Sequence, residues 1–253
     1  MTFDIPRGLV FPVAGVDVTL DPLPHPFELE NDAAIARNWL EETSQNPALF
    51  NGTVVLLSAL SYAERRLVGR CHAVAFATFL YWRRNRTTAP AEHSFAHAVL
   101  ISRDGALIAV RMGLHTANPG KVYFAAGSFE PADFRDELVD LEFNMEREVR
   151  EETGLDISGA ARDPDYHAYS SEKGTVIFRG YRLDEDAETI AARIRDFVAS
   201  DPEPEIDGPV IIRDASDLPA GLMPHMQPLI DWHFSHQVAT GEGGGRISGK
   251  TRY

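Results

Sequence analysis

The stretch Arg147–Leu155, REVREETGL, gathers three glutamates within little more than one helical turn. Successive residues of an α-helix are about 100° apart, so positions i, i+3 and i+4 share one face. Glu148, Glu151 and Glu152 have this spacing, and like charges so placed repel one another mildly. Either this face is exposed to solvent and balanced by neighbouring arginines, or a cation lies between the carboxylates.

A divalent cation is the ligand that such a face would suit. Oxygen donors in this number favour a hard ion such as Mg²⁺ or Mn²⁺. Mg²⁺ keeps several waters and is often completed by substrate phosphates, so one acidic helix is enough to present it. Met145 and Val149, four residues apart, are expected to pack this helix on a sheet, and Gly154 is a typical residue to end it.

Strand and helix patterns alternate on both sides of this helix. Residues 97–112 carry two apolar, β-branched runs on either side of Asp104-Gly105, which is a strong hairpin signal. Further strands are predicted at 121–127, 174–183 and 208–214, and helices at 141–153, 186–200 and 224–237. This alternation predicts an α/β domain with a mixed sheet.

The N-terminal part has the pattern of a small α+β domain. It contains an irregular proline-rich run at 21–32, helices at 31–43 and 77–85, strands at 52–60 and 65–76, and a polar linker at 84–93. We therefore predict an N-terminal domain at 1–90 and a second domain at 91–237, followed by a glycine-rich flexible tail at 238–253.

Composition and charge restrict the classes of function. The 253 residues are 44% hydrophobic and 25% charged, which is typical of a soluble globular protein. A formal net charge of -14 argues against general binding to nucleic acid or to anionic membranes, but it permits a small phosphorylated substrate that brings a divalent cation. The single cysteine, Cys71, fits a reducing compartment. No signal peptide and no membrane-length apolar run is found, so we expect a cytoplasmic location.

With its surroundings, Arg147–Leu155 resembles the second half of the Nudix box, the signature of the Nudix hydrolase family. That signature is Gly, five residues, Glu, seven residues, then Arg-Glu-aliphatic-any-Glu-Glu-any-Gly-aliphatic. Every specified position of the second half is present, and a predicted strand ends upstream in Gly127, where the family has its glycine. The resemblance covers 127–155 as a motif and about 95–232 in the order of elements. It implies a Nudix-like α/β/α sandwich with a mixed sheet, preceded here by the small α+β domain.

The first half of the motif departs from the pattern in length. Nineteen residues, 128–146, separate Gly127 from Arg147, where the pattern has thirteen. Counting back from Arg147 places the glutamate of the first half on Val139. The extra length lies within FEPADFRDELVDL, residues 129–141, so the departure alters the loop before the helix.

The resemblance implies a Mg²⁺- or Mn²⁺-dependent pyrophosphohydrolase that cleaves the diphosphate bond of a nucleoside diphosphate joined to another group. The metal candidates are Glu148, Glu151 and Glu152, and the catalytic candidates are Glu148, Glu151 and Arg147. Glu151 is the base that we favour on the helix. Glu172 and Glu205 are alternatives, because some members of the family take the base from a separate loop.

Substrate contacts are predicted between the strands that lead to the motif. Polar residues there can line a cleft, and the candidates are Arg111, His115, Thr116 and Gly127, with Asn118, Lys121, Lys173 and Arg179 as weaker ones. His115 and Thr116 would suit phosphate or ribose hydroxyls. His93 and His97 fall in a predicted strand, where positions i and i+4 lie too far apart to share a metal.

The N-terminal part indicates a substrate class. The string NPALFNG, residues 46–52, and the strand after it resemble longer Nudix proteins, some of which act on nucleotide sugars such as UDP-glucose. We therefore expect a small nucleoside diphosphate derivative of the UDP-sugar or ADP-ribose type, and a homodimer is also compatible. The altered first half of the motif favours an alternative, a Nudix-fold nucleotide-binding or regulatory protein with weak or no catalysis.

Overall fold

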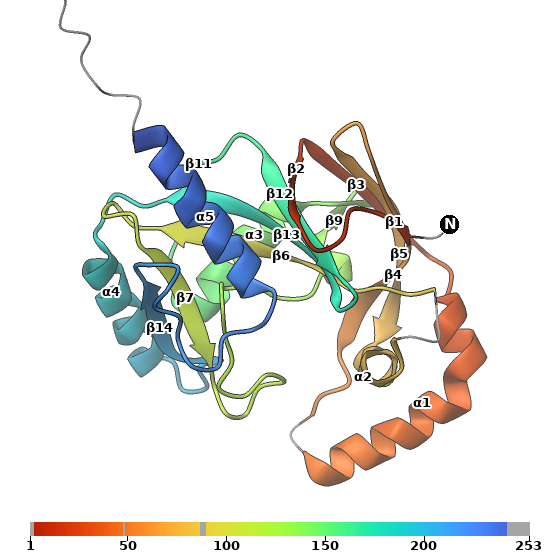
Figure 1. The fold of residues 1–253 in the computed structure, drawn as a ribbon. Coiled ribbons are helices and arrows are strands. Elements are labelled where there is room, and N and C mark those ends of the chain that lie inside the picture. The colour runs from red at the N-terminus through yellow and green to blue at the C-terminus, as the bar shows by residue number, and fades with distance from the viewer. Residues whose placement is uncertain (1–2, 48, 87–89, 242–253) are drawn as a thin grey trace, which may run out of the picture.

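The computed structural model describes residues 3–47, 49–86 and 90–241, whose strands form two sheets (Figure 1). The smaller sheet has six strands, which are in spatial order β1 (Phe3–Asp4), β4 (Thr53–Ala63), β5 (Arg66–Ala75), β3 (Gly15–Asp21), β10 (Leu138–Val139) and β9 (Phe134–Arg135). Two helices accompany it, α1 (Pro26–Gln45) and α2 (Phe76–Arg84). α2 packs on β4 and β5, and α1 packs on α2.

The larger sheet has eight strands and belongs mainly to the C-terminal part. Its main path is β14 (Ile206–Ile212), β7 (Leu107–Met112), β6 (Ser94–Ile101), β13 (Gly174–Arg182), β12 (Tyr166–Ser171) and β2 (Val10–Val13), while β8 (Val122–Tyr123) pairs with β7 and β11 (Ala161–Arg162) with β13. β6 and β13 run parallel and the other pairs antiparallel, so the sheet is mixed.

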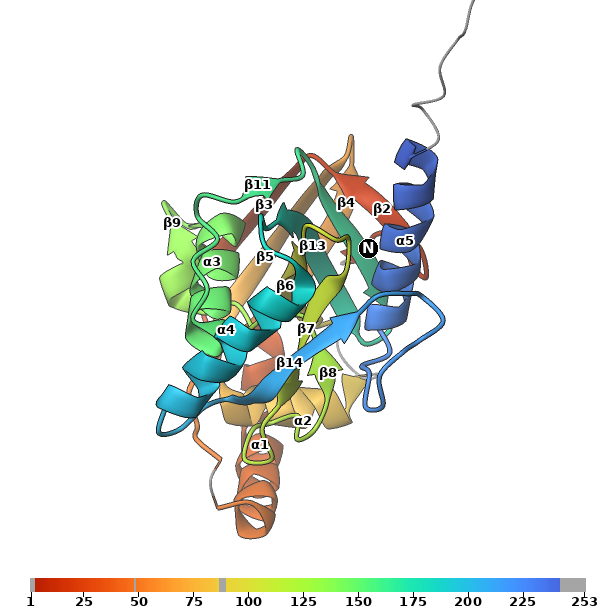
Figure 2. The ribbon, with the colours of Figure 1, turned by 90° about the vertical axis from the view of Figure 1, so that its left-hand side faces the viewer.

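Helices cover both faces of the larger sheet. Figure 2 shows α3 (Leu141–Thr153) and α4 (Ala187–Ser200) on one side of it and α5 (Met226–Gly241) on the other. The predicted α/β/α sandwich with a mixed sheet is therefore confirmed. Within the described residues, no helix combines the length and the apolar character that crossing a lipid bilayer requires.

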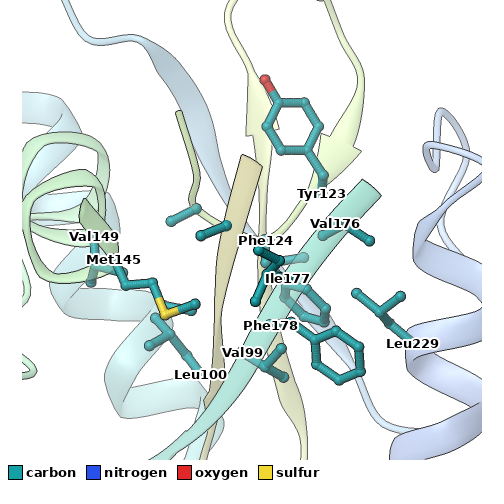
Figure 3. Close-up of a cluster of buried hydrophobic side chains, with 14 of the residues drawn as sticks. Val99, Leu100, Tyr123, Phe124, Met145, Val149, Val176, Ile177, Phe178 and Leu229 are labelled. Carbon is teal, nitrogen blue, oxygen red and sulfur yellow. The ribbon is translucent and has the colours of Figure 1, made fainter. Parts of the chain in front are cut away.

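The core of this sandwich lies between α3, the sheet and α5. Figure 3 shows Met145 and Val149 of α3 on one side of the sheet strands and Leu229 of α5 on the other. Both α3 residues are fully buried, as their spacing predicts. The ring of Tyr123 points its hydroxyl away from this apolar cluster (Figure 3).

Each sheet contains a strand or hairpin from the other part of the chain. β2, from the N-terminal part, pairs with β12 at the edge of the larger sheet. In the opposite direction, β9 and β10 form a hairpin whose Leu138 pairs with Thr19 of β3 in the smaller sheet. This hairpin lies in the loop between Gly127 and α3, so the extra length of that loop serves to reach the N-terminal sheet.

Local signals explain where the helices begin and end. α3 starts after Asp140, whose side chain accepts the Phe143 N–H, and ends at Gly154 with φ 69°, so its predicted bounds are confirmed. α1 begins at Pro26, five residues before the predicted helix at 31–43, because the His25 side chain caps it and proline suits the first turn. The irregular run predicted at 21–32 is thus partly wrong.

The predicted tail at 238–253 falls mostly outside the described residues. Residues 238–241 are the last of α5, and 242–253 are not described.

Candidate functional site

The acidic face of α3 is largely buried. Glu148 is 8% exposed and Glu152 is 4% exposed, whereas the Glu151 side chain is 58% exposed. A solvated surface is therefore the wrong interpretation for Glu148 and Glu152. Their burial follows from the packing of Met145 and Val149 on the sheet, which turns the neighbouring face of α3 toward the loop that ends at Gly127. The strand predicted at 121–127 is partly wrong, because β8 ends at Tyr123 and residues 124–127 form this loop.

The backbone of that loop contacts both carboxylates. The Ala126 N–H donates to Glu152 Oε2 at 3.3 Å. A Cβ built on Gly127 would lie 2.1 Å from Glu148 Oε1, so only glycine leaves space for this carboxylate. The structure thus places Gly127 against a predicted metal ligand. Its predicted contact with substrate stays a prediction.

Burial sets the protonation of the two carboxylates. Desolvation raises the pKa of Glu148 to about 8, although the Arg147 guanidinium opposes it. Burial also raises the pKa of Glu152 well above its ordinary value, and the charges of Glu148 and Glu205 add to this effect. Burial therefore favours the protonated form of both groups as long as no cation is bound.

Arg147 connects three acids. Its Nη2 lies 3.0 Å from Asp133 Oδ1 and 2.8 Å from Glu148 Oε1, and its Nη1 lies 2.9 Å from Glu151 Oε2. Asp133 is fully buried and also accepts from Asn144 Nδ2 at 2.9 Å. Arg147 therefore positions Glu148, while Glu151 is held at the exposed side of the helix.

Asp133 corrects the alignment of the first half of the motif. Counted forward from Gly127, five residues, 128–132, precede Asp133, which is the spacing of the pattern with aspartate in place of glutamate. The placement on Val139 is wrong, because Val139 is a buried apolar residue of β10 and the Asp133 carboxylate contacts Arg147. The extra residues all follow Asp133. A forward count would have found it.

The donors at this site fit a hard divalent cation in their chemistry. Glu148 and Glu152 offer only oxygen, and because burial raises the pKa of both, a bound cation would favour their ionised form. As the side chains stand, no group of three or more His, Cys, Asp or Glu residues among those described is arranged as a metal site. The Glu151 carboxylate turns to Arg147, and its part in metal binding stays a prediction.

A cleft of about 940 Å³ lies between the loop after β7 and the connection from α4 to β14. It is lined by His115, Thr116, Ala117, Val198, Pro202, Glu203, Pro204, Glu205, Ile206 and Asp207. The Gly113 N–H donates to the Glu205 carbonyl at 2.8 Å and joins the two walls. Glu205 also connects the cleft to the buried acids, because its charge raises the pKa of both Glu148 and Glu152.

The other substrate candidates lie outside this lining. Arg111 Nη1 donates to the carbonyls of Gly120 at 3.2 Å and Ala220 at 3.1 Å, so it braces two loops. Glu172 and Lys173 form the turn between β12 and β13. Asn118, Lys121 and Arg179 are also absent from the lining, and the guanidinium of Arg179 lies over the ring of Tyr166.

His93 and His97 have separate partners. His93 Nε2 lies 3.0 Å from Ser128 Oγ, and His97 Nε2 lies 2.9 Å from His225 Nε2. The rings of His97 and His225 stack at a centroid distance of 5.1 Å. His225 comes from the segment before α5, so its contact with β6 has no local signal in the sequence.

No family model and no curated protein matches the chain. Among solved structures, it is similar to the MutT protein from Methanosarcina mazei Go1, with 16% identity and a TM-score of 0.38 over 58% of this chain and 95% of that one. It is also similar to a Nudix hydrolase from Nitrosomonas europaea, with 14% identity and a TM-score of 0.34 over 59% of this chain and 90% of that one.

A third similar structure is the Nudix domain of Shewanella oneidensis NrtR in complex with ADP ribose. It has 12% identity and a TM-score of 0.36, over 58% of this chain and 88% of that one. The second and third of these structures are named as Nudix proteins, and the stretch 147–155 resembles the signature of that family. Their identities and TM-scores are too low to assign a reaction or a ligand to this chain.

Proposed function

We propose that the protein is a metal-dependent Nudix-type hydrolase that cleaves the diphosphate bond of a nucleoside diphosphate joined to a sugar. The buried pair Glu148 and Glu152, held against the loop backbone at Ala126 and Gly127, is the observation that supports this most strongly. Burying two carboxylates next to each other is unfavourable for folding unless the site has a charged ligand to bind.

Glu148 and Glu152 would hold Mg²⁺ or Mn²⁺, with Glu151 at the edge of the site. When bound, the cation would neutralise charge on a diphosphate, which is what allows water to attack phosphorus. The chain itself supplies the position of the carboxylates. Arg147 holds Glu148 by its 2.8 Å contact, and the Ala126 N–H orients Glu152.

Glu205 is a stronger candidate for the general base than Glu151. It lines the cleft, and its charge reaches both buried acids. Glu151, in contrast, is ion-paired with Arg147 and mostly exposed. A base has to accept a proton from water beside the substrate, and a carboxylate at the cleft wall has the better position for this.

The lining of the cleft favours a neutral group rich in hydroxyls. Glu203, Glu205 and Asp207 supply three acidic side chains, and neither lysine nor arginine occurs among the described lining residues. Carboxylates accept hydrogen bonds from sugar hydroxyls and repel further phosphates. This supports a sugar or a terminal ribose, as in nucleotides of the UDP-sugar or ADP-ribose type, over coenzyme A or dinucleoside polyphosphates.

The test is hydrolysis by the full chain with Mg²⁺ or Mn²⁺, followed by ³¹P NMR of the products. The panel would be UDP-glucose, ADP-ribose, a dinucleoside polyphosphate and coenzyme A. We expect cleavage of the first two, loss of activity in Glu152→Gln, and normal activity in Glu64→Gln, which changes an exposed glutamate of the turn between β4 and β5.

Two results would contradict the proposal. A folded protein that cleaves no member of the panel is not this hydrolase. Tight nucleotide binding by calorimetry that is unchanged by Mg²⁺ and by Glu152→Gln would instead identify the regulatory alternative.

A further inference from the structure

An apolar stripe runs along the outer face of α1. Leu29, Ala33, Ala36 and Leu40 follow one another at spacings of four, three and four residues and are all exposed. Leu29 is 67% exposed and Leu40 is 69% exposed. Residues with this spacing share one face of a helix, and it is the a/d spacing of helices that pack side by side.

The opposite face of α1 already has its partner. Phe27, Ile35 and Asn38 are the buried residues of this helix, and α1 packs on α2. Figure 2 shows α1 projecting past the rest of the molecule. The stripe therefore points away from the elements that the structure describes.

Charged residues on both sides of the stripe indicate which partner packs against it. Asp32 precedes Ala33 and Arg37 follows Ala36, and both are exposed. They flank the stripe, five residues apart, at the positions that are called g and e in a coiled coil. In two parallel helices, a g residue of one helix lies beside the e residue five positions later in the other. A second copy of α1 would thus pair each Asp32 with Arg37 of the other copy.

We propose that the chain forms a homodimer in which two copies of α1 pack in parallel along Leu29, Ala33, Ala36 and Leu40. The two alanines allow the helix backbones to approach each other, and the leucines pack against their counterparts at the two ends of the stripe. An antiparallel pair is disfavoured, because it would place Asp32 near Asp32 and Arg37 near Arg37 of the second copy. The seam is short, so the dimer dissociates on dilution.

A charge swap in the full chain tests this arrangement by analytical ultracentrifugation over a wide range of concentration. D32R and R37D should each weaken the dimer by about tenfold, because like charges then face each other twice. The double variant D32R/R37D should restore the dimer. An equal mixture of the two single variants should form heterodimers. Restoration is the result that a merely destabilised helix cannot give.

Two further variants complete the test. Leu40→Glu should leave a monomer, whereas the control Leu9→Glu, at a leucine that is 52% exposed elsewhere, should not. Ala36→Cys should form a covalent dimer on mild oxidation, because position 36 of one copy lies opposite position 36 of the other only in the parallel pair. The native Cys71 is buried and should not interfere. A wild-type chain that stays monomeric, a dimer indifferent to Leu40→Glu, or no restoration by the double variant would overturn the proposal. None of these results bears on the proposed hydrolysis.

Discussion

In Glu148 and Glu152, charge and burial oppose each other. Each would be ionised in water near neutral pH, yet both lie in the interior with exposures of 8% and 4%. The Arg147 guanidinium and the Ala126 N–H offset part of this cost. Under the proposed function, the pair would be prepared for a cation at the expense of the stability of the metal-free protein.

Glu152→Gln tests this conflict directly. The amide can still accept from the Ala126 N–H but carries no charge. We expect hydrolysis to slow by roughly 10²–10³-fold, while the metal-free variant unfolds at an equal or higher denaturant concentration than the wild type. Steady-state rates and urea unfolding measure the two effects. If the variant instead unfolds readily, the carboxylate has a structural role.

Asp133 is expected to be important for stability, because it is the buried partner of Arg147. Asp133→Ala removes the fully buried counter-ion of the guanidinium, leaving it only Glu148 and Glu151. It also removes the acceptor of Asn144. We expect the free energy of unfolding to fall by about 3 kcal/mol, measured by urea denaturation. Asp217→Ala, at an exposed aspartate, is the matched control. A change as small as that of the control would show that Arg147 is held by other contacts.

Buried histidines make stability depend on pH. Burial lowers the pKa of His93 to about 3 and that of His225 to about 4. Below pH 6.5 these histidines are protonated in the unfolded chain but stay neutral in the folded chain. They therefore lower the free energy of unfolding as the pH falls from 6.5 toward 4. Above pH 6.5 the effect is absent.

His225→Gln should remove its share of this acid sensitivity, about 3 kcal/mol between pH 6.5 and 4. Urea unfolding at several pH values would measure it, with His236→Gln at an exposed histidine as the control. Equal pH slopes for the variant and the wild type would show that the contact of His97 with His225 does not resist protonation.

The hairpin of β9 and β10 is the element that distinguishes the motif of this chain. Its two-residue turn, Asp136-Glu137, has φ values of 49° and 68°, and the Leu20 N–H donates to the Glu137 carbonyl at 2.9 Å. The Arg135 guanidinium lies 4.4 Å from the ring centroid of Phe143 in α3. The hairpin thus joins the N-terminal sheet to the first turn of the acidic helix.

This turn offers a stabilising substitution. Both residues lie in the left-handed region, which a type I′ turn requires and which glutamate occupies at a cost. Glu137→Gly should raise the free energy of unfolding by about 1 kcal/mol. The same exchange at Glu41, inside α1, should lower it by a similar amount. A loss of stability at both positions would mean that the turn is not strained.

Local signals in the sequence were sufficient for α3 and for the hairpin of β6 and β7, because caps, glycines and hydrophobic spacing lie within the elements themselves. They were insufficient for β9 and β10, since Asp136-Glu137 lacks the Asn-Gly character of such turns. Glu148 and Glu152 were found from the motif. The position of Glu205 at the wall of the cleft depends on a contact with the distant Gly113, for which the sequence has no signal.

At the scale of the whole molecule, the two sheets are interlocked. β2 carries Phe11 and Val13, which are 4% and 0% exposed, into the core of the larger sheet. Residues on either side of the predicted boundary at 90 belong to one continuous hydrophobic cluster.

We therefore expect residues 91–253, produced alone, to lack cooperative unfolding. Without β2, β12 would become the edge strand of the larger sheet, and the apolar residues beneath Phe11 would be exposed. Thermal denaturation followed by circular dichroism, compared with the full chain, measures this. A sharp transition in the fragment would show that the larger sheet folds independently.

The pairing of Thr19 with Leu138 also affects the order of events during synthesis. Because these partners are 119 positions apart, β3 leaves the ribosome long before β10 exists to cover it. The nascent chain thus presents an open strand edge for much of its translation, which is the kind of surface that chaperones shield.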